Sequence, residues 1–153
     1  MSEAMTKEQL LQEFAAAFER FIGIATEAEQ RGVIQAGGVW GPREVVAHLA
    51  GWEAIATVRV PKIAAGMPPI EFADEERQTV FNDMINAALV TMIGDQSFDA
   101  VCGILRQAYQ RDIAMMRMLD DARFQPGEYV YERAKSVIDH CQEHGEQLVP
   151  THP

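Results

Sequence analysis

Two histidines near the C-terminus are placed so that they could share one metal ion. His140 and His144 lie four residues apart in the segment SVIDHCQEHGEQL, which has the pattern of one helix. Helix positions i and i+4 share a face, about 5–6 Å apart at Cβ. An imidazole binds zinc at about 2.0–2.1 Å, so one ion could reach both rings. Because structural sites use four protein ligands and catalytic sites about three, a metal site requires a further ligand from elsewhere.

His48 is the candidate for the third ligand. It lies in a helical pattern at the edge of, or within, an inward face that includes Val45 and Leu49. The fourth histidine, His152, follows Pro150 in the tail, where we expect it to be solvated. If the helix of His48 faces the last helix, three imidazoles meet in a bundle core, a common place for metal sites. Three neutral nitrogens suit Zn, Ni, Fe or Cu and do not distinguish among them.

Two other interpretations of the histidines stay open. A histidine on a helix is commonly a hydrogen-bonded core or rim residue, although burying three unpaired imidazoles would cost several kcal/mol. The pair also matches the H-x-x-E-H pattern of inverted zinc peptidases, with Glu143 as the base. Such enzymes are normally far larger than this chain. Glu143 lies about 100° around the helix from His144, so we expect it to be solvated or to contact the site only indirectly.

Several neighbouring residues could support the site. Trp52 lies four residues after His48 on the same face, where it could pack over the site or shape a pocket, although filling the core is the favoured interpretation. Glu53 and Asp139 could each orient a ligand imidazole by accepting its second N–H, although solvated carboxylates are the simpler interpretation. Cys141, beside His140, is expected to pack in the core rather than to bind metal.

The chain that must position these residues has the pattern of an all-α protein. Helical spacing of apolar residues predicts four principal helices and one connecting helix. The first is capped by Thr6 and runs to about Gln30, and the second begins at Pro42 and ends near Pro61 or continues to Gly66. The connecting helix spans about 74–93, the next about 97–119, and the last about 128–149. A connection from about 66 to 96 that holds its own helix is typical of a bundle with a crossover.

Composition places limits on the class of protein. The 153 residues, 48% apolar and 24% charged, predict one globular domain over 1–153. A net charge of −10 makes nucleic acid a poor partner. The sequence contains no apolar run of about 18 residues, so we expect no membrane span. The polar N-terminus has no signal-peptide pattern, so we expect a cytoplasmic location. There, Cys102 and Cys141 would be buried thiols rather than a disulfide.

Two blocks of the chain resemble the DinB-like superfamily of four-helix bundles. The segment VWGPREVVAHLAGWE, residues 39–53, is similar to the family block with a histidine on the second helix. The segment DHCQEHGEQL, residues 139–148, is similar to its H-x-x-x-H block. Residues 7–11 and 81–86 also resemble a subgroup that includes the colibactin self-protection protein.

The resemblance implies an up-down-down-up bundle with a long crossover between the second and third helices. It also implies a divalent metal ion (Zn, Ni or Fe) on His48, His140 and His144, and a homodimer. Members of the superfamily include S-transferases that use bacillithiol or mycothiol and a maleylpyruvate isomerase, and many have no known activity.

Three functions follow as hypotheses. The first is a metal-dependent enzyme, a thiol S-transferase or a hydrolase, in which the ion activates a low-molecular-weight thiol or water against an electrophilic small molecule. The second is a non-catalytic module of the same fold that binds or sequesters a small molecule in stress or self-protection. The third is a structural metal that only clamps two helices.

Overall fold

The computed structural model describes residues 4–33 and 40–149. Five α-helices and a short 3-10 helix make up its regular structure, and these ranges contain no strand. The helices are α1 (Lys7–Arg31), α2 (Pro42–Ala64), α3 (Glu75–Ile93), α4 (Phe98–Arg117) and α5 (Tyr129–Leu148), with η1 at Asp121–Phe124. The all-α prediction is confirmed for the described residues. The expectation that His152 is solvated concerns a residue outside the described ranges. No helix in these ranges is long and apolar enough to cross a membrane.

The helix ends follow from local signals in the sequence. Thr6 begins α1 with a capping box, in which its side chain accepts the N–H of Gln9 and the Gln9 side chain accepts the N–H of Thr6. Gly32 ends α1 in the left-handed conformation, with φ of 65°. Asp74 and Ser97 cap α3 and α4 in the same way as Thr6, through side-chain oxygens.

The hydrophobic core lies between α1, α2, α4 and α5. Phenylalanines of α1 fill its centre, and apolar stripes of the other three helices surround them. The largest fully buried side chains include Phe14, Phe18, Phe21, Phe124, Leu10, Leu11, Leu49, Leu105, Met116 and Leu148. At about 25 cal/mol per Å² of buried apolar surface, these side chains are the main source of stability.

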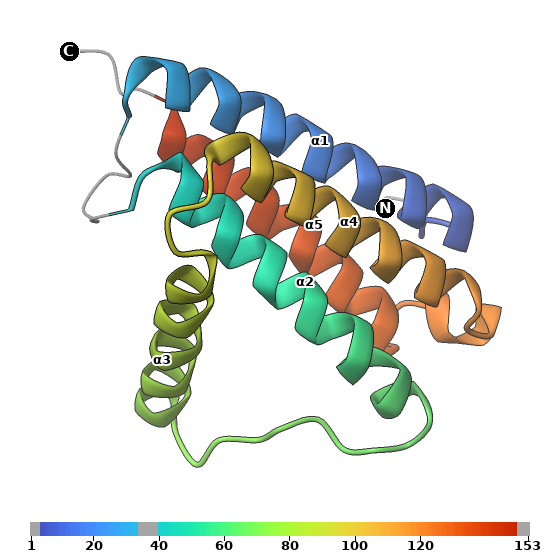
Figure 1. Ribbon diagram of the computed structural model, residues 1–153. Helices are drawn as coiled ribbons and strands as arrows, with labels where there is room; N and C mark the ends of the chain where they lie inside the picture. Colours follow the sequence, from blue (N-terminus) through green and yellow to red (C-terminus); the bar gives the residue numbers. More distant parts are fainter. Residues whose placement is uncertain (1–3, 34–39, 150–153) are drawn as a thin grey trace.

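Contacts at the helix ends fix how the bundle is arranged. The Arg43 guanidinium, at the start of α2, donates to the carbonyls of Gly94 at 2.7 Å and Gln96 at 2.9 Å, just before α4. Lys7, at the start of α1, donates to the carbonyl of Leu119 at 2.7 Å, just after α4. Hence α2 and α4 begin at the same end of the bundle, and α1 begins where α4 ends (Figure 1).

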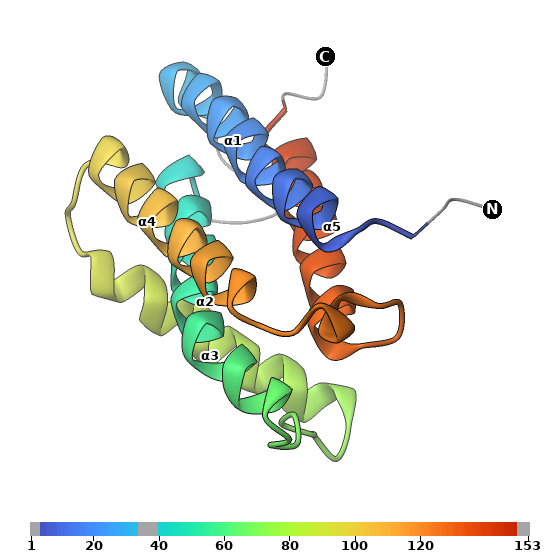
Figure 2. The same ribbon diagram turned by 90° about the vertical axis from the view of Figure 1, so that its right-hand side faces the viewer.

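The helix α3 lies outside the four-helix core, as the sequence pattern predicted (Figures 1 and 2). Only Ile93 of α3 is buried, at the end that leads into α4. The helix packs on α2 at Gly51, where the Cβ of any larger residue would lie 2.4 Å from Cδ2 of Leu89. The connection before α3 leaves α2 at Ala64, so Pro61 lies inside the helix and does not end it.

Candidate metal centre

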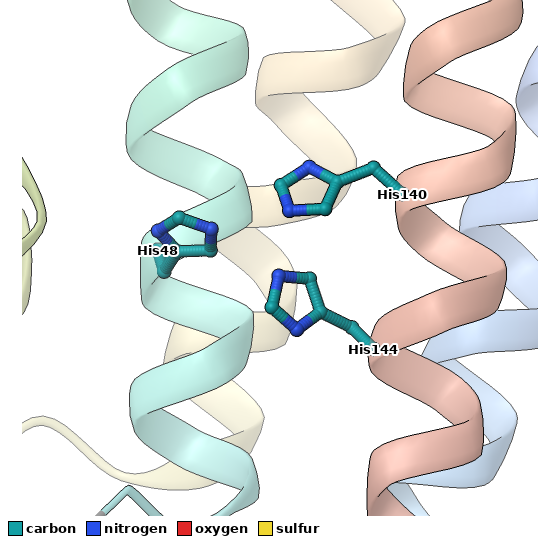
Figure 3. Close-up of side chains that lie close together, drawn as sticks. All are labelled: His48, His140 and His144. Atoms are coloured by element: carbon teal, nitrogen blue, oxygen red, sulfur yellow. The ribbon is translucent and has the colours of Figure 1, made fainter. Parts of the chain in front are cut away.

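Three histidines converge between α2 and α5 (Figure 3). His48 comes from α2, and His140 and His144 come from successive turns of α5. Their candidate ligand atoms all lie within 4.8 Å of one another. Ring centroids are separated by 5.5 Å between His48 and His140, 5.1 Å between His48 and His144, and 4.4 Å between His140 and His144. The structure thus brings together the three residues selected from the sequence.

Burial keeps these imidazoles neutral near pH 7. His48 is 6% exposed and His144 9% exposed, and His140 is half-buried. Loss of solvation lowers the pKa of His48 to about 4, and repulsion from His144 and His140 acts in the same direction. Burial and the neighbouring His140 lower the pKa of His144 to about 4, and burial lowers the pKa of His140. Neutral rings carry the free nitrogen lone pair that metal binding requires.

The cluster fits a divalent metal ion. Nε2 of His144 is buried and has no hydrogen-bond partner among the described residues, an arrangement that typically costs about 1–3 kcal/mol. Two nitrogens bound to one ion at about 2.0–2.1 Å lie no more than about 4.2 Å apart. Small side-chain rotations would therefore bring the three rings to one ion. An ion would also give the unpaired nitrogen of His144 a partner.

Amide oxygens, rather than carboxylates, contact the outer nitrogens of two of the rings. Nδ1 of His48 lies 2.9 Å from Oδ1 of Asn86 on α3, and the same oxygen accepts the indole N–H of Trp52 at 2.7 Å. Nδ1 of His144 lies 3.0 Å from Oε1 of Gln147. Such outer partners orient metal-binding histidines. Asn86 was not assigned a role from the sequence, because nothing in a helical pattern shows that α3 turns this residue toward α2.

Among the described residues, neither carboxyl group proposed for that orienting role hydrogen-bonds to a histidine. Glu53 binds Arg133 through both oxygens, at 3.0 and 2.8 Å. Asp139 is exposed. For Glu53 both interpretations were wrong, because it is buried and binds Arg133 instead of an imidazole, whereas the solvated interpretation of Asp139 is confirmed. A helical pattern shows which face a residue occupies but not which partner the facing helix offers.

A cleft of about 610 Å³ leads to the histidines. Among the residues that the structure describes, its lining includes His48, Trp52, Asn86, Arg133 and His140, but not His144. A small molecule in the cleft therefore reaches the cluster past His48 and His140. The Trp52 side chain is only partly buried and lines this cleft, so the expectation that it mainly fills the core was wrong.

A buried charge cluster lies at the side of the cleft. The Arg133 guanidinium donates to Glu53 and, at 2.7 Å, to Oδ2 of Asp112. The three side chains are 10%, 3% and 0% exposed, and Oδ1 of Asp112 has no partner within the described ranges. Loss of solvation holds the pKa of Glu53 well above its usual range, against the favourable charge of Arg133, while Asp112 raises it further. Glu53 is thus no free general base.

The remaining candidates are not positioned for chemistry. Cys102 and Cys141 are buried free thiols, as expected, and burial raises the pKa of Cys102 to about 11 and that of Cys141 to about 12. Glu143 is exposed on α5, in agreement with the expectation that it is solvated. The chemistry of the site therefore depends on the three histidines and the side chains of the cleft.

Comparison of the chain with protein-family models, with curated proteins and with solved structures found no match. Function is therefore inferred from the geometry of this centre and from the residues that surround it.

Proposed function

We propose that His48, His140 and His144 bind one divalent metal ion, and that the chain is a metal-dependent enzyme acting on an electrophilic small molecule. The buried Nε2 of His144 carries the proposal, because it lies beside two other neutral imidazoles and no other described group hydrogen-bonds to it. Zinc, nickel and iron all accept such a set of ligands. The reaction we favour is S-transfer from a low-molecular-weight thiol, with hydrolysis as the variant that uses water.

In the proposed enzyme, the histidines would hold the ion and the other residues of the cleft would bind the substrate. Three protein ligands leave positions open on the ion, and a bound divalent ion lowers the pKa of a thiol or water. His48 and His140 border the cleft, so they flank the route by which a substrate arrives. The Trp52 ring and the Tyr129 side chain line the same cleft and provide apolar surface for the electrophile. In S-transfer, the sulfur forms a bond to the electrophilic carbon, the leaving group departs with its electron pair, and the thiol proton passes to solvent.

The proposal includes the fold and assembly of the DinB-like superfamily. An up-down-down-up order of α1, α2, α4 and α5 is supported by the contacts of Arg43 and Lys7 at the helix ends. A homodimer is supported by exposed apolar side chains such as Val58 and Ile104, which border a groove of about 870 Å³. Light scattering on the purified chain tests the dimer, and a monomeric mass would contradict it.

Metal content provides the first test. The chain is purified without an affinity tag, incubated with zinc or nickel, dialysed and analysed by mass spectrometry. We expect one ion per chain, lost on His48→Ala and on His144→Ala. The matched control is Glu143→Gln, which changes an exposed residue of the same helix turn and should leave metal content unchanged. Wild-type protein without metal would overturn the proposal.

Turnover provides the second test. The metal-loaded chain is assayed with chlorodinitrobenzene and with a panel of low-molecular-weight thiols that includes bacillithiol and mycothiol. Thioether formation that disappears in His48→Ala supports the enzyme. Retention of the electrophile without turnover would favour the alternative, a binding or sequestering module, because the cleft is present with or without chemistry. Neither retention nor turnover, with a lower Tm after chelation, would indicate a structural metal.

A further inference from the structure

The side-chain amide oxygen of Asn86 lies within hydrogen-bond distance of two ring nitrogens beside the proposed metal centre. Oδ1 of Asn86 lies 2.7 Å from Nε1 of Trp52 and 2.9 Å from Nδ1 of His48. Trp52 and His48 are one helical turn apart on α2, whereas Asn86 reaches them from α3. All three side chains are at least partly buried, so these contacts are sheltered from water.

The indole of Trp52 fixes the orientation of the Asn86 amide. An indole N–H can only donate a hydrogen bond. The atom of Asn86 that faces it must therefore be the oxygen, because the amide NH₂ group would set donor against donor. The usual freedom of an asparagine to exchange its oxygen and nitrogen is absent here.

The orientation of the amide then fixes the tautomer of His48. Since Oδ1 of Asn86 can only accept, the Nδ1 atom that faces it at 2.9 Å must carry the hydrogen. A neutral imidazole has a single N–H, so Nε2 of His48 keeps its lone pair. Figure 3 shows one ring nitrogen of His48 directed toward His140 and His144, where that lone pair is needed.

We propose that Trp52 and Asn86 are positioning residues that hold His48 in the Nδ1–H tautomer and so present its Nε2 to the metal ion. The proposal rests on the metal site proposed above, but its first half concerns the metal-free protein. It also gives α3 a role in the site. Ile93 is the one buried residue of α3. The hydrogen-bond contact between Asn86 and His48 connects this outer helix to the histidines.

The tautomer is measured directly on the metal-free protein. Long-range proton–nitrogen NMR of the chain labelled with ¹⁵N-histidine distinguishes Nδ1–H from Nε2–H. We expect His48 to be in the Nδ1–H form near neutral pH, and Asn86→Ala to convert it to a mixture or to Nε2–H. Trp52→Phe keeps an aromatic ring but removes the N–H, so the amide becomes free to turn and the same change should follow. An Nε2–H form in the wild type, or no change in both variants, would overturn the proposal.

Metal affinity provides the second readout, by competition for zinc with a chromogenic chelator. Loss of an outer hydrogen-bond partner typically weakens metal binding about 10–100-fold, which we expect for Asn86→Ala. Asn86→Asp should restore binding, since a carboxylate oxygen accepts from both rings. The matched control is Asn82→Ala, one turn earlier on α3 in the same cleft, which should bind zinc like the wild type.

The outcomes separate this proposal from the one on which it rests. If the wild type binds no zinc, the proposed function fails, whatever the NMR shows. If the wild type and Asn86→Ala bind zinc equally, the positioning role is overturned while the metal site stands. Should Asn86→Ala fail to fold, Asn86→Asp and Trp52→Phe still decide the question, because the first must preserve the tautomer and the second must disturb it.

Discussion

The carboxyl group of Glu53 lies 2.8 Å from Nη2 of Arg133, and this buried contact joins α2 to α5 beside the cleft that leads to the histidines. The same guanidinium holds Asp112 of α4 at 2.7 Å. One guanidinium therefore contacts two buried carboxyl groups, and the raised pKa of Glu53 favours its protonated form beside Asp112. In an interior of low dielectric, such a group is costly unless all its members are paired.

Replacing Arg133 with methionine should strongly destabilise the fold. The variant would leave Glu53 and Asp112 buried without a cation, and removal of one member of a buried ion pair typically costs about 3–5 kcal/mol. Urea denaturation of the metal-free protein measures this loss. The control is Arg106→Met, which breaks a half-exposed pair with Glu19 and should cost at most about 1 kcal/mol. Equal losses in the two variants would contradict the importance of the buried cluster.

Glu53 should make stability fall as pH rises. Its pKa is raised in the folded protein, mainly by loss of solvation, so the folded state binds this proton more tightly than the unfolded state. The resulting stabilisation is complete below the ordinary pKa of a glutamate and is lost as pH rises through the higher pKa of the folded protein. We expect Glu53→Gln to remove this dependence.

The measurement is a series of denaturation curves for both proteins at increasing pH, without metal. The charged groups that face Glu53 are Asp112 from α4 and Arg133 from α5, and they are the same in both proteins. The difference between the two curves therefore isolates Glu53. A difference that is constant with pH would show that Glu53 carries no proton in the folded protein.

Metal binding should resist mild acid. In the folded protein the pKa of His48 and of His144 is lowered to about 4, so protons compete weakly with the metal ion at pH values where ordinary imidazoles, with a pKa of about 6.5, are charged. Zinc affinity should change little between about pH 7 and about pH 5.5, and should fall as pH approaches the lowered pKa values. Calorimetric titration at several pH values measures this. A loss of affinity that begins near pH 6.5 would be contrary to this prediction.

The close contact between Gly51 and Leu89 should make Gly51 intolerant of even alanine. An added Cβ would lie 2.4 Å from Leu89, so α3 or its leucine must move, and overpacking of this kind costs about 1–3 kcal/mol. Hydrogen exchange in α3 should increase in Gly51→Ala. The control is Gly103→Ala in α4, where a Cβ meets none of the described residues within 4 Å. There alanine should stabilise the helix by about 0.5–1 kcal/mol. Exchange in α3 that is unchanged in Gly51→Ala would show that the leucine adjusts alone.

Much of the helical framework could be predicted because its signals are local. Thr6 caps the first helix as predicted, and α3 and α4 begin directly after positions 74 and 97, where the sequence placed their starts. Apolar spacing identified the four core helices and the outer one. Pro61 was ambiguous, since a proline either ends or bends a helix, and here the helix continues through it to Ala64. The 3-10 helix η1, in the connection between α4 and α5, was not predicted, because apolar spacing does not reveal so short an element.

The site was predictable to the extent that it depends on spacing along one helix. His140 and His144 follow from i, i+4 geometry, and His48 followed as the one other histidine in a helical pattern. Asn86 could not be found in this way, because its role depends on how α3 docks. Asp112 and Glu53 did leave a signal, since each occupies an inward position of an apolar stripe, in register with Leu105 and Leu49 respectively. A charged residue at such a position indicates a buried partner, and that partner is Arg133.

The division of the three histidines between α2 and α5 has a consequence for how the protein is made. Because His48 is synthesised well before α5, a nascent chain that ends short of His140 holds one imidazole and cannot retain an ion through this site. If the proposed site holds an ion, all three of its ligands come together only after α5 has packed against α2. Once bound, the ion would act as a reversible cross-link between the two helices, so its departure would loosen the helix that closes the bundle.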